Sequence, residues 1–160
     1  MSGLYFRGKL TYANTFGRAP VGVSSVLVIT PCEGLRPPEQ RVNVRRLERF
    51  GEVPVAAPEA RYRRPLMRDA MALAKSLDTQ SEVVLLGSIA TGKYLDVLAE
   101  VLGDRLRFPA EFVGRGDMSR GGLLLRCVDE GRELSYVPLL GADRHGPRPP
   151  RLAPLARRQA

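Results

Sequence analysis

Tryptophan is absent from the 160 residues, histidine occurs once, and cysteine occurs only at Cys32 and Cys127. Neither cysteine has a second cysteine or a histidine at a metal-ligand spacing, so we predict no zinc site and no cofactor. The two widely separated cysteines favour a reducing, cytoplasmic setting, and residues 1–18 lack the apolar run of a secretory signal. No run of about 18 apolar residues is present, so we also expect no membrane-spanning helix.

Lysine is scarce as well, with three residues against 22 arginines. Together these bases outnumber the 17 acidic residues and give a formal net charge of +8. Guanidinium groups bind phosphates through paired N–H donors, which points to a polyanionic partner. The alternative is a coding bias of a GC-rich genome, in which case the charge has no functional meaning.

Half of the excess charge lies in the last 18 residues, which carry five arginines and one acidic residue. From Gly141 onward the chain is rich in proline and arginine and has no apolar periodicity. We therefore predict an extended or disordered tail over residues 141–160. Its arginines are candidates for contact with nucleic acid or a protein partner: Arg144, Arg148, Arg151, Arg157 and Arg158.

Residues 1–140 have the length and apolar content of a single domain. The runs 25–30 and 82–86 are typical of strands buried on both faces. Apolar residues at helical spacing predict helices over 62–77 and 94–102, and a short helix over 42–50 with Asn43 as its N-cap. This order predicts one α/β, Rossmann-like domain with three layers and a partly parallel sheet.

Three further segments are expected from weaker patterns. Residues 4–12 alternate loosely and predict an edge strand. Residues 114–122 contain four glycines and predict a loop. The segments 123–128 and 133–138 flank a turn at 129–132, which predicts an antiparallel hairpin at the edge of the sheet.

The first candidate site is the segment 87–93, which follows a predicted strand and opens a helix. Its spacing G-x-x-x-x-G-K resembles the phosphate-binding loop of the P-loop nucleotidases. There, glycines let backbone N–H groups wrap a phosphate and the lysine meets the terminal phosphates. Tyr94 stands where that family has the Ser or Thr that binds magnesium, so the resemblance implies anion binding more than magnesium-dependent hydrolysis. The candidate anion-binding residues are Gly87, Ser88, Thr91, Gly92 and Lys93.

The second candidate site is the glycine-rich segment 114–122. Arginines on such a loop can clamp phosphate while the backbone comes close, which makes Arg115 and Arg120 anion-binding candidates, with Ser119 as a hydrogen-bond donor. Asp117 is a candidate base, or a group that orients Arg120. For both segments the alternative is an ordinary surface loop with solvated basic side chains.

The third candidate is Glu33, in the turn after the predicted strand over 25–30. A carboxylate at a dry strand end can have a raised pKa, so Glu33 joins Asp117 as a catalytic acid or base candidate. Cys32 beside it is expected to be buried and inert, because a thiolate nucleophile needs a base and His145 lies in the tail.

Ligands of open α/β sheets bind beyond the carboxyl ends of the parallel strands. The turn 30–34 and the segment 87–93 both follow predicted strands, and the segment 114–122 can fold over the same edge. We therefore expect these three stretches to meet in one positively lined pocket.

Residues 12–20 (YANTFGRAP), 84–94 (VLLGSIATGKY) and 108–126 (FPAEFVGRGDMSRGGLLLR) resemble an uncharacterised family of conserved bacterial proteins. The resemblance spans most of the chain and implies a single compact domain. It carries no activity with it, so it assigns no catalytic residue.

Two functions follow from this sequence. The first is binding of a nucleotide or of nucleic-acid phosphate at the strand-end loops, with or without catalysis on a nucleotide or base. The second is a non-catalytic adaptor or subunit that docks a partner through its basic tail and the exposed face of the helix 62–77.

Overall fold

The computed structural model describes residues 3–89, 92–143 and 145–152 of the chain. Helices and short strands alternate through these ranges, which confirms the predicted mixture of α and β structure. The elements are α1 (Gly3–Phe16), β1 (Val28–Thr30), β2 (Gly34–Arg36), α2 (Val44–Gly51), α3 (Ala60–Ser76), β3 (Val83–Val84), α4 (Gly92–Leu102), η1 (Gly103–Arg105), β4 (Leu106–Pro109), η2 (Ala110–Phe112), α5 (Asp117–Glu130) and β5 (Tyr136–Pro138).

The larger sheet has the order β3-β4-β5 and is mixed. β3 and β4 are parallel, with Val83 opposite Leu106, and α4 forms the crossover between them. β4 and β5 are antiparallel, with Phe108 opposite Val137. The predicted partly parallel sheet with an antiparallel edge is therefore present, although β5 pairs with β4 and not with the segment 123–128.

The predicted strand over 25–30 belongs to a different sheet. β1 pairs only with β2, in an antiparallel hairpin that sets Val28 opposite Arg36. The hairpin packs on α3, where the Leu35 N–H donates to the Asp69 carboxylate at 3.0 Å. The turn 30–34 therefore does not lie at the edge of the sheet that contains β3 and β4.

Residues 4–12 lie in helix α1, so the predicted edge strand is wrong. The buried residues Tyr5, Gly8 and Tyr12 are three and four positions apart, which is the period of a helix and not of a strand. With two of these positions occupied by tyrosine and one by glycine, the buried stripe is hard to recognise by hydrophobicity alone.

The predicted loop over 114–122 and strand over 123–128 are also wrong, because α5 begins at Asp117 and continues to Glu130. Leu123, Leu124 and Cys127 are all buried, at spacings that place them along one side of the helix. A short apolar run is compatible with a strand or a buried helix, and periodicity alone does not separate the two. Gly131, with a φ of 63°, ends the helix where a hairpin turn was expected.

Three predicted helices are confirmed. α2 begins after Asn43, whose side chain accepts a hydrogen bond from the Arg46 N–H at 3.0 Å. α3 and α4 cover the segments expected from their apolar spacing. No described helix is both long and apolar enough to cross a lipid bilayer.

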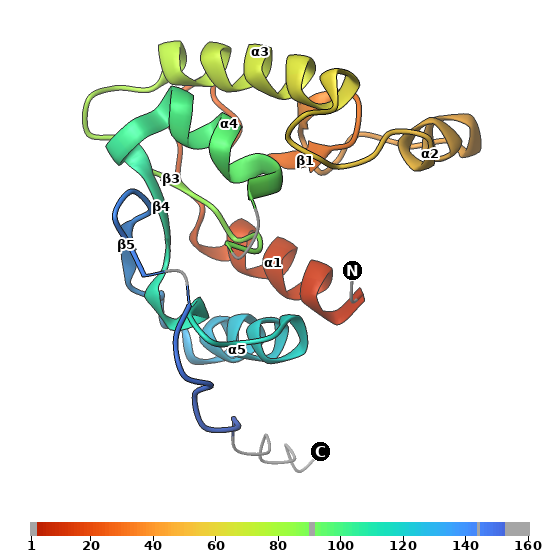
Figure 1. Ribbon diagram of the computed structural model, residues 1–160. Coiled ribbons are helices and arrows are strands. Elements are labelled where there is room, and N and C mark those ends of the chain that lie inside the picture. The colour runs from red at the N-terminus through yellow and green to blue at the C-terminus, as the bar shows by residue number, and fades with distance from the viewer. Residues whose placement is uncertain (1–2, 90–91, 144, 153–160) are drawn as a thin grey trace.

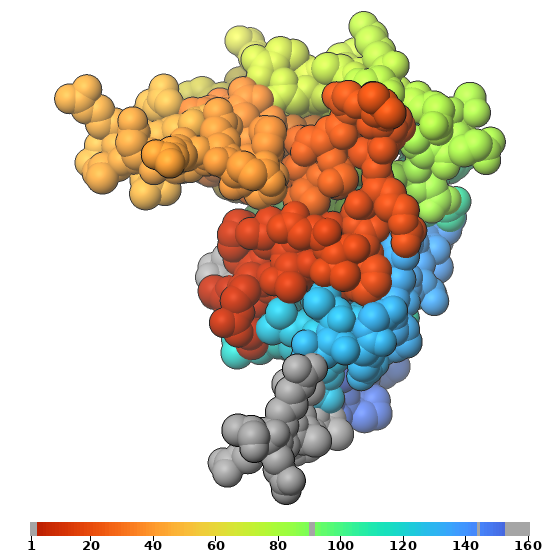
Figure 2. Space-filling view, turned by 180° about the vertical axis from the view of Figure 1, so that it is seen from behind, coloured from red at the N-terminus to blue at the C-terminus, as the bar shows by residue number. Residues whose placement is uncertain are grey.

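Two apolar cores hold the elements together. The first joins α3, α4 and β4 and includes the fully buried Tyr62, Leu66 and Leu106. The second joins α1 and α5 and includes Tyr12 and Leu124. Figure 1 shows α3 and α4 at one end of the molecule and α1 and α5 at the other, with β3 and β4 running between the two pairs. α2 projects to one side as an arm (Figure 2).

The contact between α1 and α5 depends on two glycines. A Cβ atom added to Gly8 would lie 2.8 Å from the carbonyl oxygen of Gly121, and a Cβ added to Gly121 would lie 2.9 Å from Cα of Tyr5. Both distances are below van der Waals contact with backbone atoms that cannot move independently. Glycine is therefore needed here for close helix packing and not for a flexible loop.

We predict that Gly121→Ala destabilises the protein by about 1–3 kcal/mol, because overpacking outweighs the gain in helix propensity. Urea denaturation measures the free energy of unfolding. The matched control is Gly51→Ala, where an added Cβ meets no neighbour within 4 Å. Equal stability of Gly121→Ala and the parent protein would contradict the close contact of α1 and α5.

Candidate functional site

The segment 87–93 is closed by its own neighbours. A Cβ atom on Gly87 would lie 2.5 Å from the Tyr94 hydroxyl, which donates a hydrogen bond to the carbonyl of Ser88 at 2.8 Å. A Cβ on Gly92 would lie 2.5 Å from the carboxylate of Asp96. The two glycines thus face a phenol ring and a carboxylate. Lys93 is exposed at the start of α4, and Thr91 lies outside the described residues.

Arg120 lies at the predicted second site, but its side chain is buried and serves the fold. Its Nε and Nη2 donate to the carbonyl of Phe112 at 3.3 and 3.2 Å, and its guanidinium lies over the Phe112 ring. Nη1 is 3.7 Å from Asp117, whose side chain is about half exposed. Arg120 therefore connects the first turn of α5 to η2, and Asp117 forms an ion pair with it.

Two of the three predicted stretches lie close together. The Tyr5 hydroxyl of α1 donates to the carbonyl of Leu86 at 2.7 Å. Burial raises the pKa of Tyr5 more than any other cause. The positive charge of Arg120 lowers this pKa, and the negative charge of Asp117 raises it. Burial likewise raises the pKa of Tyr94, which the charge of Arg120 lowers and the charge of Asp117 raises. Helix α1 therefore contacts both the start of α5 and the segment that follows β3, and it brings the two close together.

Glu33 does not join this group, and the prediction that its pKa is raised is wrong. Its carboxylate accepts hydrogen bonds from Nε of Arg46 at 2.9 Å and from Nη2 of Arg49 at 2.9 Å. The Arg46 hydrogen bonds, more than any other cause, hold the pKa of Glu33 below its usual range. Glu33 therefore connects α2 to the β1–β2 hairpin, and it is already engaged by arginines.

The structure brings four other predicted residues together in one pocket. A cavity of about 310 Å³ is lined by the start of α5 and by residues 148–152 of the tail. We call it the arginine pocket, because Arg115, Arg148 and Arg151 all line it. The sequence predicted these arginines at two separate places, and their meeting was not expected. Arg144, Arg157 and Arg158 lie outside the described residues.

Hydrogen bonds fix one wall of the arginine pocket. Arg115 donates from Nε to the carbonyl of Glu111 at 3.0 Å and from Nη1 to the Ser119 hydroxyl oxygen at 3.2 Å. Gly116 is the N-cap of α5 and has no side chain to bond the first N–H groups of the helix. Within the described parts of the chain, none of the three arginines forms an ion pair.

Glycines explain why the tail lies against this wall. Gly114 has a φ of 70°, and a Cβ atom there would collide with the carbonyl oxygen of Pro147. A Cβ on Gly122 would lie 3.5 Å from the side chain of Leu152, which packs against the second core. Gly121 thus makes room for α1 and Gly114 makes room for the tail, whereas a Cβ at Gly122 would meet Leu152 at an ordinary van der Waals distance.

Another cavity was missed entirely from the sequence. It measures about 750 Å³ and lies between the end of α1, the segment 23–29, the end of α3 and β3. Tyr12 and Tyr136 line it with hydroxyl oxygens 2.7 Å apart, and Tyr136 donates to Glu133 at 2.9 Å. These side chains come from distant, isolated positions, so no motif or spacing in the sequence links them.

Metal and thiol chemistry find no support in the described residues. No group of three or more His, Cys, Asp or Glu side chains is arranged there to hold a metal ion. Cys32 and Cys127 are free, and burial raises the pKa of the Cys127 thiol. Cys127 is therefore a core residue, whereas Cys32, which was expected to be buried, is only half-buried.

Comparison of this chain with protein-family models, curated proteins and solved structures found no match. The resemblance to a bacterial protein family therefore stays a prediction. The interpretation of the site depends on its geometry and charge.

We predict a pH-dependent role for Glu33. Because its pKa is lowered in the folded state, its ion pairs stabilise the protein above the ordinary carboxyl pKa of 4.5, and this contribution is lost as the pH falls below that value. Glu33→Gln should lower the free energy of unfolding at pH 7, and its difference from the parent should shrink between pH 4.5 and pH 3.

Urea denaturation as a function of pH measures this effect, with Glu39→Gln as the control because Glu39 is exposed. A difference between Glu33→Gln and the parent that stays constant down to pH 3 would contradict the role of the Glu33 carboxylate.

Proposed function

We propose that this protein binds the phosphate groups of a nucleotide or a nucleic acid in the arginine pocket. The observation that carries the proposal is the convergence of Arg115, Arg148 and Arg151 on one cavity without an ion pair among the described residues. Three arginines around one cavity give it a positive charge, which a bound anion would balance. Phosphate is the anion whose geometry suits the paired donors of arginine.

The start of α5 supports the same ligand. Its first N–H groups lack a side-chain cap, and the helix dipole favours a negative charge at this end. The Ser119 hydroxyl accepts from Arg115, which leaves its proton for a phosphate oxygen. Pro149 and Pro150 restrict the backbone of the opposite wall, which lies between Arg148 and Arg151.

The proposal is for binding and not for catalysis. The described lining of the arginine pocket contains no carboxylate, imidazole or thiol that could act as a base or nucleophile. Asp117 lies in the same turn of α5, but it is paired with Arg120. We do not extend the proposal to the segment 87–93, because Tyr94 and Asp96 occupy the space against its glycines.

Two finer expectations belong to the proposal. The parallel β3–α4–β4 crossover supports a Rossmann-like relationship, since such units build those folds. The two free cysteines support a cytoplasmic location, where thiols stay reduced.

We predict that Arg148→Glu/Arg151→Glu weakens binding of a fluorescein-labelled 12-nucleotide single strand by at least tenfold (about 1.4 kcal/mol), because two phosphate contacts are replaced by repulsion. Fluorescence anisotropy at several salt concentrations measures the affinity. The slope of log affinity against log salt should fall by about 1.4, since each contact on a single strand contributes about 0.7.

Lys93→Ala tests the segment 87–93 as an alternative site and should bind the strand like the parent. Titration with a mononucleotide distinguishes the two sources of phosphate, because only a nucleotide site saturates with the monomer. Unchanged affinity in the double variant, or its loss in Lys93→Ala alone, would overturn the proposal.

A further inference from the structure

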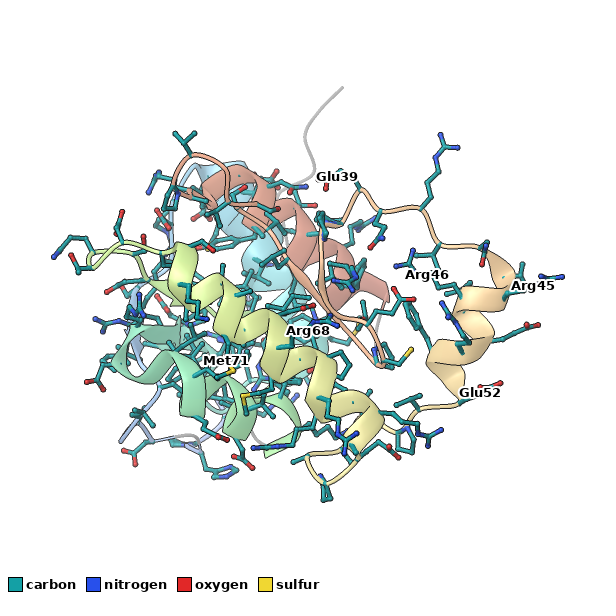
Figure 3. The ribbon with its side chains drawn as sticks, turned by 90° about the horizontal axis from the view of Figure 1, so that it is seen from above. Glu39, Arg45, Arg46, Glu52, Arg68 and Met71 are labelled. Atoms are coloured by element: carbon teal, nitrogen blue, oxygen red, sulfur yellow. The ribbon has the colours of Figure 1, made fainter. Side chains whose placement is uncertain are left out.

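We propose that the outward face of α3 docks an acidic amphipathic helix of a protein partner. This face forms a shallow groove of about 710 Å³, which we call the α3 groove. Its principal lining residues are Ala60, Arg64, Met67, Arg68, Met71 and Lys75. Figure 3 looks onto α3 from this side, with Arg68 and Met71 labelled.

The α3 groove is basic throughout. Arg63, Arg64, Arg68 and Lys75 line it, and none of its described lining residues is acidic. Arg64 and Lys75 form no ion pair with any residue the structure describes. Arg63 pairs with Glu100 at 2.7 Å, but such an exposed ion pair contributes little and exchanges readily. Arg68 pairs at 2.7 Å with Asp69, whose side chain is only 17% exposed, so the charge of Arg68 is partly balanced. The surface therefore selects an acidic partner.

The spacing of the charges fits a helix. Arg64, Arg68 and Lys75 are four and seven residues apart, which places them along one side of α3 at intervals of about 6 and 10 Å. The groove from Ala60 to Lys75 is about 22 Å long, the length of roughly four helical turns. A partner helix that carries Glu or Asp at matching intervals can pair with all three bases.

The floor of the α3 groove favours a protein over a nucleic acid. Methionine and alanine side chains form it, and the side chain of Met71 is exposed, with 52% of its residue surface accessible. Methionine adapts to apolar side chains of different shapes and is common at such binding surfaces.

This surface is independent of the arginine pocket. The inner face of α3 is already buried in the first core through Tyr62, Leu66 and Ala70, so only the outer face is open to a partner. Figure 1 shows α3 and the described part of the tail at opposite ends of the molecule. Loss of one function by mutation therefore leaves the other intact.

The test uses the full chain and two labelled 18-residue helical peptides. One peptide has leucines along one face and glutamates on its flanks, and its twin has lysines in place of the glutamates. Fluorescence anisotropy should show saturable, salt-sensitive binding of the glutamate peptide and at least tenfold weaker binding of the lysine twin.

Charge reversal gives the sharpest readout. Arg64→Glu/Arg68→Glu should lose at least tenfold in affinity for the glutamate peptide and gain affinity for the lysine twin. Met71→Ala should lower the affinity for the glutamate peptide several-fold without changing the salt dependence of that affinity, because it removes only apolar contact. Lys75→Glu provides the same charge test at an exposed position with no described partner if the double variant does not fold.

Arg148→Glu/Arg151→Glu is the matched control, because it removes the same amount of positive charge from the arginine pocket and should bind the glutamate peptide like the parent. The proposal would be overturned by equal binding of the two peptides or by the absence of saturable binding. It would also be overturned if the control lost as much affinity for the glutamate peptide as Arg64→Glu/Arg68→Glu does. So would a 12-nucleotide RNA that binds the parent but not Arg64→Glu/Arg68→Glu, because the groove would then be a nucleic-acid site.

Discussion

The close packing of α1 on α5 is the constraint on which the rest of the structure depends. At Gly8 and Gly121 the two helix backbones approach so closely that no side chain fits between them. This contact fixes the direction of α5 and therefore the position of its first turn. Arg115 and Ser119 take their places from that turn, and the tail lies against it. A glycine-rich sequence thus acts as a rigid support and not as a mobile loop.

The arginines of this protein fall into two groups that the composition does not distinguish. Arg120 is buried against Phe112, and Arg46 and Arg49 share the carboxylate of Glu33, so these three maintain the fold. Other basic side chains have no acidic partner in the described structure, as at Arg64 and along the arginine pocket. Coding bias can raise the number of arginines, but it does not explain why three of them without an acidic partner in the described structure line one cavity.

Local signals in the sequence predicted the elements whose structure is decided locally. The N-cap at Asn43 and the apolar spacing of α3 are read within a few residues, and both predictions are confirmed. Glycine is ambiguous, because it serves turns and close helix contacts equally, and Gly121 belongs to the second kind. The arginine pocket and the Tyr12–Tyr136 pair depend on contacts between distant segments, which no spacing in a single sequence encodes.

The central claim is that the first turn of α5 and the tail form one phosphate site. Titration of the isotopically labelled protein with inorganic phosphate, followed by backbone amide NMR, tests it most directly. The account predicts saturable shifts of the amides of residues 116–119 and of Arg148, Arg151 and Leu152, with one shared dissociation constant, and no comparable shifts at Gly87 or Lys93. Shifts centred on the segment 87–93, or shifts at the tail without any at α5, would contradict it.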